Sequence, residues 1–193
     1  MASEKQWSWD WRFNPSFRER VHAIGVVVLN FNHLELMKQE LFIQLSGLEP
    51  NTAQKLFLEL GSSRDLDMLK RFANDENAGD GILEHTLYFI EGFDLCSQNR
   101  NVIAHGLHLD PFKEDFVLRK QVRKQLRTDD FPLTVVDLRR AADDICRFDL
   151  YAHTILEWRL DAAKRGRRTK PRFGKPQKPL LLNPLKSRAR KTG

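Results

Sequence analysis

The feature of this 193-residue sequence that most constrains its fold is a run of apolar residues that recur every three or four positions from 17 to 45. They are Phe17, Val21, Ile24, Val28, Phe31, Leu34, Met37, Leu41 and Leu45. An α-helix has about 3.6 residues per turn, so this spacing places them on one helix face about eight turns long. Ser16 followed by Glu19 is typical of a capping box, and Gly47 with Pro50 is typical of a helix end. The sequence therefore predicts a long amphipathic first helix.

Similar patterns predict four further helices. Their expected spans are 52–60, 63–75, 82–105 and 134–163. Gly61 and Gly106 are placed to end two of them, and Thr134 followed by Asp137 is typical of the start of the last one. Residues 107–118 read as a small hairpin. The expected fold class is all-α: an up-and-down bundle of about five helices, with a small hairpin between the last two long helices.

By composition the chain divides into three parts. We expect an N-terminal arm at 1–15, a helical bundle at 16–163 and a C-terminal tail at 164–193. The arm carries aromatic residues in strict alternation, namely Trp7, Trp9, Trp11 and Phe13. Alternation suits an extended segment that lays its rings on one side. We interpret it as an arm that packs on the bundle or on a dimer partner, with a base-stacking platform as the alternative.

The positive charge of the chain is concentrated in its tail. Residues 164–193 hold 12 Lys and Arg and no Asp or Glu, which leaves 20 basic and 26 acidic residues in positions 1–163. The tail also contains four prolines, so we expect it to be disordered. Such a segment attracts polyphosphate chains. Its expected nucleic-acid-binding residues are Arg165, Arg167, Arg168, Lys170 and Arg172, although the tail could instead bind an acidic protein partner or be merely solvated.

Several classes of protein do not fit the sequence. Cys96 and Cys146 lie in helical patterns without metal-ligand spacing, so we expect reduced cysteines, no metal site and no cofactor. The longest strongly apolar run, 24–29, is far shorter than a membrane span, and the first residues do not resemble a secretion signal. We therefore expect a cytoplasmic protein without membrane partners.

One string stands out chemically: Arg100-Asn101-Val102-Ile103-Ala104-His105-Gly106. At about 100° per residue, Asn101 and His105 share a helix face, whereas Arg100 and His105 point about 140° apart. Convergence of Arg100 and His105 on one phosphate would then require a distorted helix end or a second copy of the chain. A two-fold dimer would place two Arg and two His around one cleft.

Such a group suits metal-independent cleavage of RNA. One His accepts the proton of the 2′-hydroxyl, another protonates the leaving 5′-oxygen, and the planar Arg stabilises the negatively charged phosphorane. The spacing alone is not specific, because Arg147 and His153 form a second match. Arg and His also serve structural roles in last helical turns, where they meet free carbonyls. From the residues alone, that structural role is the simpler interpretation.

The string and the helix layout resemble the HEPN superfamily, in which an Arg is followed after four to six residues by a His, often with Asn directly after the Arg. The resemblance covers residues 16–163. It implies a dimeric, metal-independent endoribonuclease of a type common in toxin–antitoxin and phage-defence systems. Arg100 and His105 would be catalytic, Asn101 would support them, and an antitoxin is a possible partner.

The sequence departs from one subtype of this superfamily. A toxin subtype ends its motif in His, any residue, Tyr, and here Leu107 occupies the Tyr position. The resemblance also allows a second function, because some superfamily members bind without cutting. The alternative is therefore a noncatalytic HEPN-like module that binds nucleic acid or protein.

Overall fold

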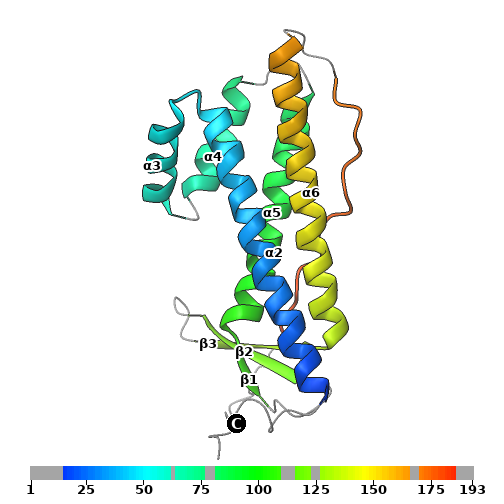
Figure 1. Cartoon of the computed structure of the whole chain (residues 1–193). Coiled ribbons are helices and arrows are strands. Elements are labelled where there is room, and N and C mark those ends of the chain that lie inside the picture. Colours follow the sequence, from blue (N-terminus) through cyan, green and yellow to red (C-terminus); the bar gives the residue numbers. More distant parts are fainter. Residues whose placement is uncertain are drawn as a thin grey trace, which may run out of the picture.

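The computed structural model of the chain describes residues 15–61, 64–76, 81–109, 116–122, 127–165 and 170–185. These residues contain five helices and three strands (Figure 1), which are α2 (Pro15–Ser46), α3 (Pro50–Leu60), α4 (Arg64–Glu76), α5 (Ile82–His105), β1 (Leu107–Leu109), β2 (Phe116–Val122), β3 (Arg127–Leu133) and α6 (Val135–Arg165). Helix predominates, so the mainly α class is confirmed, but the sheet means that the fold is not purely all-α. The aromatic residues of the N-terminal arm lie outside the described residues.

The three long helices pack side by side and enclose the core. In Figure 1, α5 runs antiparallel to α2 and α6, and the short helices α3 and α4 cover the end of α2 that is remote from the sheet. The predicted apolar face of α2 supplies buried side chains such as Val27, Phe31, Leu34 and Leu41. The ring centroids of Phe31 and Phe93 of α5 are 5.6 Å apart. The amphipathic pattern of α2 is therefore explained by burial against α5 and α6.

The predicted helix boundaries agree with the structure to within two residues. Gly47 has a φ of +63°, the left-handed conformation that commonly ends a helix. At the start of α6, the Thr134 amide donates to Asp137 Oδ2 at 2.9 Å and the Asp137 amide donates to Thr134 Oγ1 at 3.2 Å, so the predicted cap is confirmed. The predicted cap at Ser16 is wrong, because α2 already begins at Pro15. Proline suits a first helical position, where its missing N–H costs nothing.

Gly92 allows α5 and α6 to approach closely. A Cβ atom on this buried residue would lie 1.8 Å from Cε1 of Phe148, a side chain of α6 that is itself fully buried. No real contact is that short, and a ring packed in a dense core cannot shift by the required amount without disturbing its neighbours. The glycine is therefore a packing requirement of the α5–α6 contact.

Replacing Gly92 with Ala should lower the unfolding free energy by about 2 kcal/mol, the usual cost of overpacking a core. Gly25 is the matched control, because it lies in the middle of α2 with nothing within 4 Å of the position of a Cβ. Gly25→Ala should instead raise the unfolding free energy, by up to about 1 kcal/mol, since alanine is the better helix former. Urea unfolding of both variants measures this difference. Equal effects of the two substitutions would contradict the packing argument.

A three-stranded antiparallel sheet in the order β1-β2-β3 replaces the expected hairpin. The predicted pairing of the first two strands is present, with His108 opposite Leu118. The third strand was not predicted, because its sequence Arg-Thr-Asp-Asp-Phe-Pro-Leu is mostly polar and contains Pro132. Proline is tolerated on an edge strand, and among the β3 side chains that the structure describes, Phe131 and Leu133 are the buried ones. The sheet closes the end of the bundle where α5 stops and α6 starts (Figure 1).

Residues 170–185, called the strap below, form an extended segment that runs from the end of α6 back toward the sheet (Figure 1). The buried Asn99 side chain of α5 holds the strap backbone at two points. Its Nδ2 donates to the Leu180 carbonyl at 2.9 Å, and its Oδ1 accepts from the Leu182 amide at 2.8 Å. Leu182 is only 5% exposed. At the end of the strap, the Leu185 amide donates to the Asp130 carbonyl of β3 at 2.7 Å.

The expectation that residues 164–193 are disordered is therefore wrong for the strap. The strap lacks helix and strand, as its prolines suggest, but it is docked on the bundle. Lys178 pairs with Glu91 of α5 at 2.8 Å and Lys175 pairs with Glu84. The prediction treated the basic segment in isolation, whereas the acidic body supplies its partners. Helix α6 also extends into the predicted tail, to residue 165, and residues 166–169 and 186–193 lie outside the described part of the chain.

Candidate functional site

The last turn of α5 presents the candidate motif. The helix ends at His105, as the sequence predicts, and the Gly106 amide donates to the Val102 carbonyl at 2.9 Å. Gly106 is extended, with a φ of −74°, and a Cβ there would lie 2.6 Å from the Val102 carbonyl oxygen and 3.0 Å from Cβ of Leu118. A glycine is therefore favoured by the close approach of the Val102 carbonyl of α5 and of Leu118 of β2, and not by a left-handed turn.

Arg100, Asn101 and His105 form one cluster within a single chain. Arg100 Nη1 lies 3.3 Å from His105 Nε2 and donates to Asn101 Oδ1 at 3.2 Å. His105 is exposed, whereas Arg100 and Asn101 are half-buried. If Nε2 accepts the hydrogen bond from Arg100, the ring proton lies on Nδ1. The cluster is thus open to solvent at its imidazole.

The expectation that Arg100 and His105 cannot converge in one straight helix is wrong. The long Arg100 side chain crosses the helix surface, and its guanidinium lies 5.3 Å from the centroid of the Phe31 ring of α2. That cation–π contact holds the guanidinium over the core, within reach of the imidazole. A second chain is therefore not needed to bring one Arg and one His together. Asn101, which shares a helix face with His105, accepts its hydrogen bond from Arg100.

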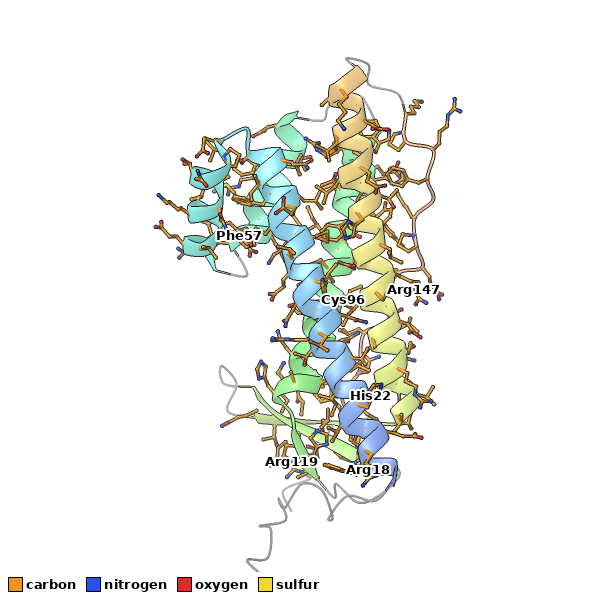
Figure 2. All side chains as sticks on the ribbon, viewed as in Figure 1. Arg18, His22, Phe57, Cys96, Arg119 and Arg147 are labelled. Atoms are coloured by element: carbon orange, nitrogen blue, oxygen red, sulfur yellow. The ribbon has the colours of Figure 1, made fainter. Side chains whose placement is uncertain are left out.

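Arg147 and His153, the second Arg/His pair with a similar spacing, lie on α6. Arg147 projects from α6 (Figure 2) and pairs with Asp144, three residues earlier on the same helix. His153 is an exposed residue one to two turns further along α6. This pair therefore provides a matched control for the Arg100–His105 motif.

Three of the expected nucleic-acid-binding residues, Arg165, Lys170 and Arg172, lie at the end of the bundle remote from the motif. Arg165 ends α6, and Lys170 and Arg172 are exposed at the start of the strap. Because α6 starts beside the sheet and has 31 residues, its far end is roughly 45 Å from the end that adjoins His105 (Figure 1). Arg167 and Arg168 lie outside the described residues. The structure therefore separates this basic group from the Arg100–His105 cluster.

A groove of about 580 Å³ runs between α4 and α5 and reaches Asn101. Its lining includes the apolar side chains Leu66, Ile90 and Leu95, the polar side chains Asp94, Gln98 and Lys70, and Lys178 of the strap. Sequence reasoning missed this groove, because Lys178 is remote in sequence and was assigned to a disordered tail. The buried position of Asn99 could have been predicted. Asn99 is a polar residue between Cys96 and Ile103 on an apolar helix face, and a polar side chain there requires a buried hydrogen-bond partner.

A separate titratable cluster lies beneath the strap. His85 Nδ1 lies 2.7 Å from the Tyr151 hydroxyl, and the ring of Phe173 in the strap packs on His85 with a centroid distance of 4.5 Å. Burial, together with the nearby charge of Lys175, lowers the pKa of His85. Burial likewise lowers the pKa of His108 in β1, where the Arg20 guanidinium adds to the effect. Both histidines therefore resist protonation in the folded protein.

Acidification should therefore destabilise the fold. As pH falls below about 6.5, the usual histidine pKa, the unfolded chain takes up protons before the folded one does, so the unfolding free energy falls. His85→Gln should flatten this dependence, and the exposed control His153→Gln should leave it unchanged. Urea unfolding at neutral and mildly acidic pH measures the slope for each protein. A His85→Gln slope equal to that of the parent would show that His85 does not carry the effect.

The comparisons with known proteins add no relative. No family model, characterised protein or solved structure matches the chain. Within the described residues, no helix is long and apolar enough to cross a membrane. The described His, Cys, Asp and Glu side chains also form no group of three or more that could hold a metal ion.

Proposed function

We propose that this chain is a metal-independent endoribonuclease of HEPN type that acts through a composite Arg/His site at a homodimer interface. The observation that supports the proposal is the contact between Arg100 and the exposed imidazole of His105, with Asn101 bonded to the same guanidinium. A permanently charged planar donor beside a solvent-accessible proton acceptor is the arrangement that phosphodiester cleavage through a phosphorane requires.

In this mechanism Arg100 turns from His105 Nε2 to the phosphoryl oxygens when RNA binds, and it donates hydrogen bonds to them as their negative charge grows. The freed Nε2 of His105 then removes the proton of the 2′-hydroxyl. Asn101 is a positioning residue, because it holds the guanidinium toward His105. The leaving 5′-oxygen needs a proton donor, and one cluster contains one imidazole. A second copy of the chain supplies the other imidazole, which makes the homodimer part of the proposal.

The surface around the cluster is compatible with a partner chain. Leu107 follows the motif directly and is 65% exposed, so a solvent-exposed apolar side chain lies two residues beyond His105 in the chain. Burial of such a side chain against a second copy would contribute to association. If the enzyme is a toxin or a phage-defence component, as the resemblance implies, an antitoxin would have to cover this same surface to inhibit it.

The test is RNA cleavage in EDTA by the parent protein, by His105→Ala and by the control His153→Ala. Both histidines are exposed, so neither substitution should unfold the chain. We expect cleavage by the parent and by His153→Ala, a loss of at least about 100-fold for His105→Ala, and a fall in specific activity on dilution below the dimer dissociation constant. Retention of RNA by all three proteins without any cleavage would instead favour the noncatalytic binding module.

A further inference from the structure

We propose that the groove between α4 and α5 binds a nucleotide next to the reacting phosphodiester and selects bases that carry an exocyclic amino group. The inference deepens the proposed function and rests on it. It assigns a specificity site to residues that the catalytic cluster does not use, chiefly Asp94 and Gln98.

The groove and the catalytic cluster are continuous. Asn101 lines the groove and also accepts the hydrogen bond from Arg100 Nη1. His105 lies four residues further along α5, a rise of about 6 Å. In the other direction the groove extends along the helix to Ile90, roughly 16 Å from Asn101. A nucleotide that lies in the groove therefore points one of its phosphates at Arg100 and His105.

The dimensions and the apolar lining suit a nucleobase. A volume of about 580 Å³ falls within the range of roughly 300 to 1,000 Å³ typical of small-ligand sites. Leu66 of α4 and Leu95 of α5 are half-buried and line the groove, whereas Ile90 is only 1% exposed and adds little surface. Leu66 and Leu95 offer an apolar surface on which the flat face of a base can pack, as bases do on apolar side chains in other single-strand binding sites.

The polar groups beside this surface are mainly hydrogen-bond acceptors. Gln98 Nε2 donates one of its two hydrogens to Asp94 Oδ2 at 2.9 Å, and the second carboxylate oxygen of Asp94 keeps free lone pairs. The Gln98 amide retains one N–H and its oxygen, so it can pair with an amino group or with a carbonyl, and the discrimination between bases falls to Asp94. Carboxylates in nucleic-acid sites accept from the amino group of cytosine, and a base with a carbonyl at that position is repelled. The groove should therefore prefer cytosine to uracil.

The positive charge at the groove comes from two lysines, which share the lining with the carboxylates of Asp67, Glu91 and Asp94. Lys178 of the strap pairs with Glu91 at 2.8 Å, and Lys70 of α4 also lines the groove. An ammonium group has three donors, so Lys178 can contact a phosphate while it keeps its carboxylate partner. Phosphate contacts of this kind position the strand without distinguishing bases. Lys70 and Lys178 should therefore affect affinity, whereas Asp94 should affect preference.

The experiment measures binding of labelled oligo(C) and oligo(U) of equal length to the inactive His105→Ala protein by fluorescence anisotropy at one salt concentration. Oligo(C) should bind about tenfold more tightly than oligo(U), because cytosine has an amino group that can donate a hydrogen bond to Asp94, whereas uracil has a carbonyl at that position. Adding Asp94→Asn should bring the ratio close to one, since an amide can also donate to the uracil carbonyl. Asp143→Asn, an exposed change on α6, is the matched control and should preserve the ratio. Lys70→Ala should weaken both oligonucleotides equally.

Equal binding of the two oligonucleotides, or a cytosine preference that survives Asp94→Asn, would overturn the groove proposal. The outcome is separate from that of the catalytic proposal, because binding is measured on a protein that lacks His105. Cleavage by the parent protein without base preference would refute the groove alone. A cytosine preference in a protein that never cuts RNA would support the groove as a binding site and refute the nuclease.

Discussion

Truncation of the chain after Arg165 is expected to lower the unfolding free energy by about 4 kcal/mol, a large share of the roughly 5 to 15 kcal/mol that stabilises a typical domain. The strap buries Leu182 and Pro179, and burial of a Leu side chain contributes about 1.5–3 kcal/mol. Its carbonyls at Leu180 and Pro176 accept from Asn99 and Tyr88. Ordering sixteen residues costs conformational entropy, which opposes the many contacts of the strap, so the expected net effect is only a few kcal/mol.

A point variant separates docking from a general effect of removing basic residues. Leu182→Ala in the full chain should lower the unfolding free energy by about 2 kcal/mol. The loss cannot exceed that caused by truncation, because a strap that is destabilised further simply undocks from the bundle. Gln177→Ala, an exposed change in the same strap, should cost nothing measurable. Chemical unfolding of the truncated chain and of both variants provides the comparison. A truncated chain as stable as the parent would show that the strap is not docked in solution.

Arg100→Lys should reduce RNA cleavage by roughly 100- to 1,000-fold, the usual cost of losing a donor that stabilises an anionic transition state. Arg100 reaches Asn101 and His105 with one planar group that rests over Phe31. Lysine keeps the charge but lacks the fixed fork of donors, so it cannot hold this geometry. Single-turnover cleavage rates measure the loss, and far-ultraviolet circular dichroism confirms that the helices remain.

Arg147→Lys is the matched control for this prediction. Arg147 pairs with Asp144 and belongs to the second Arg/His spacing match, which the structure places on α6. Its substitution should leave the cleavage rate within twofold. A rate for Arg100→Lys within threefold of the parent, or equal losses in the two variants, would contradict a role for Arg100 in the transition state.

The helices could be predicted from the sequence because their apolar spacing reflects burial on one face. The third strand could not, since Phe131 and Leu133 are the buried ones among the described β3 side chains and the strand is held mainly by its pairing with β2. Four buried charged residues, Arg20, Lys38, Asp65 and Asp144, also escape sequence reasoning. Lys38 and Asp65 form a buried ion pair at 2.8 Å, and the guanidinium of Arg20 lies 3.9 Å from the Phe116 ring centroid. Charged residues are rarely buried, so only their three-dimensional partners explain them.

The candidate site could be predicted in part. The motif identified Arg100, Asn101 and His105, but helix angles alone placed Arg100 and His105 too far apart. Helix angles describe the directions of the Cβ atoms and not the reach of a long side chain. The groove beside Asn101 depends on α4 and on the strap, which contact α5 only in the folded chain. Composition likewise suggested a free basic tail, since it could not show that Glu84 and Glu91 line its path.

The most direct test of the proposed chemistry is the structure of the RNA ends produced in EDTA. Attack by the 2′-oxygen, assisted by Arg100 and His105, leaves a 2′,3′-cyclic phosphate on one product and a 5′-hydroxyl on the other. Mass spectrometry of a defined oligonucleotide should therefore show cyclic-phosphate products with the parent protein and intact substrate with His105→Ala. Products that carry 5′-phosphates, or the same cyclic products from His105→Ala, would contradict the account.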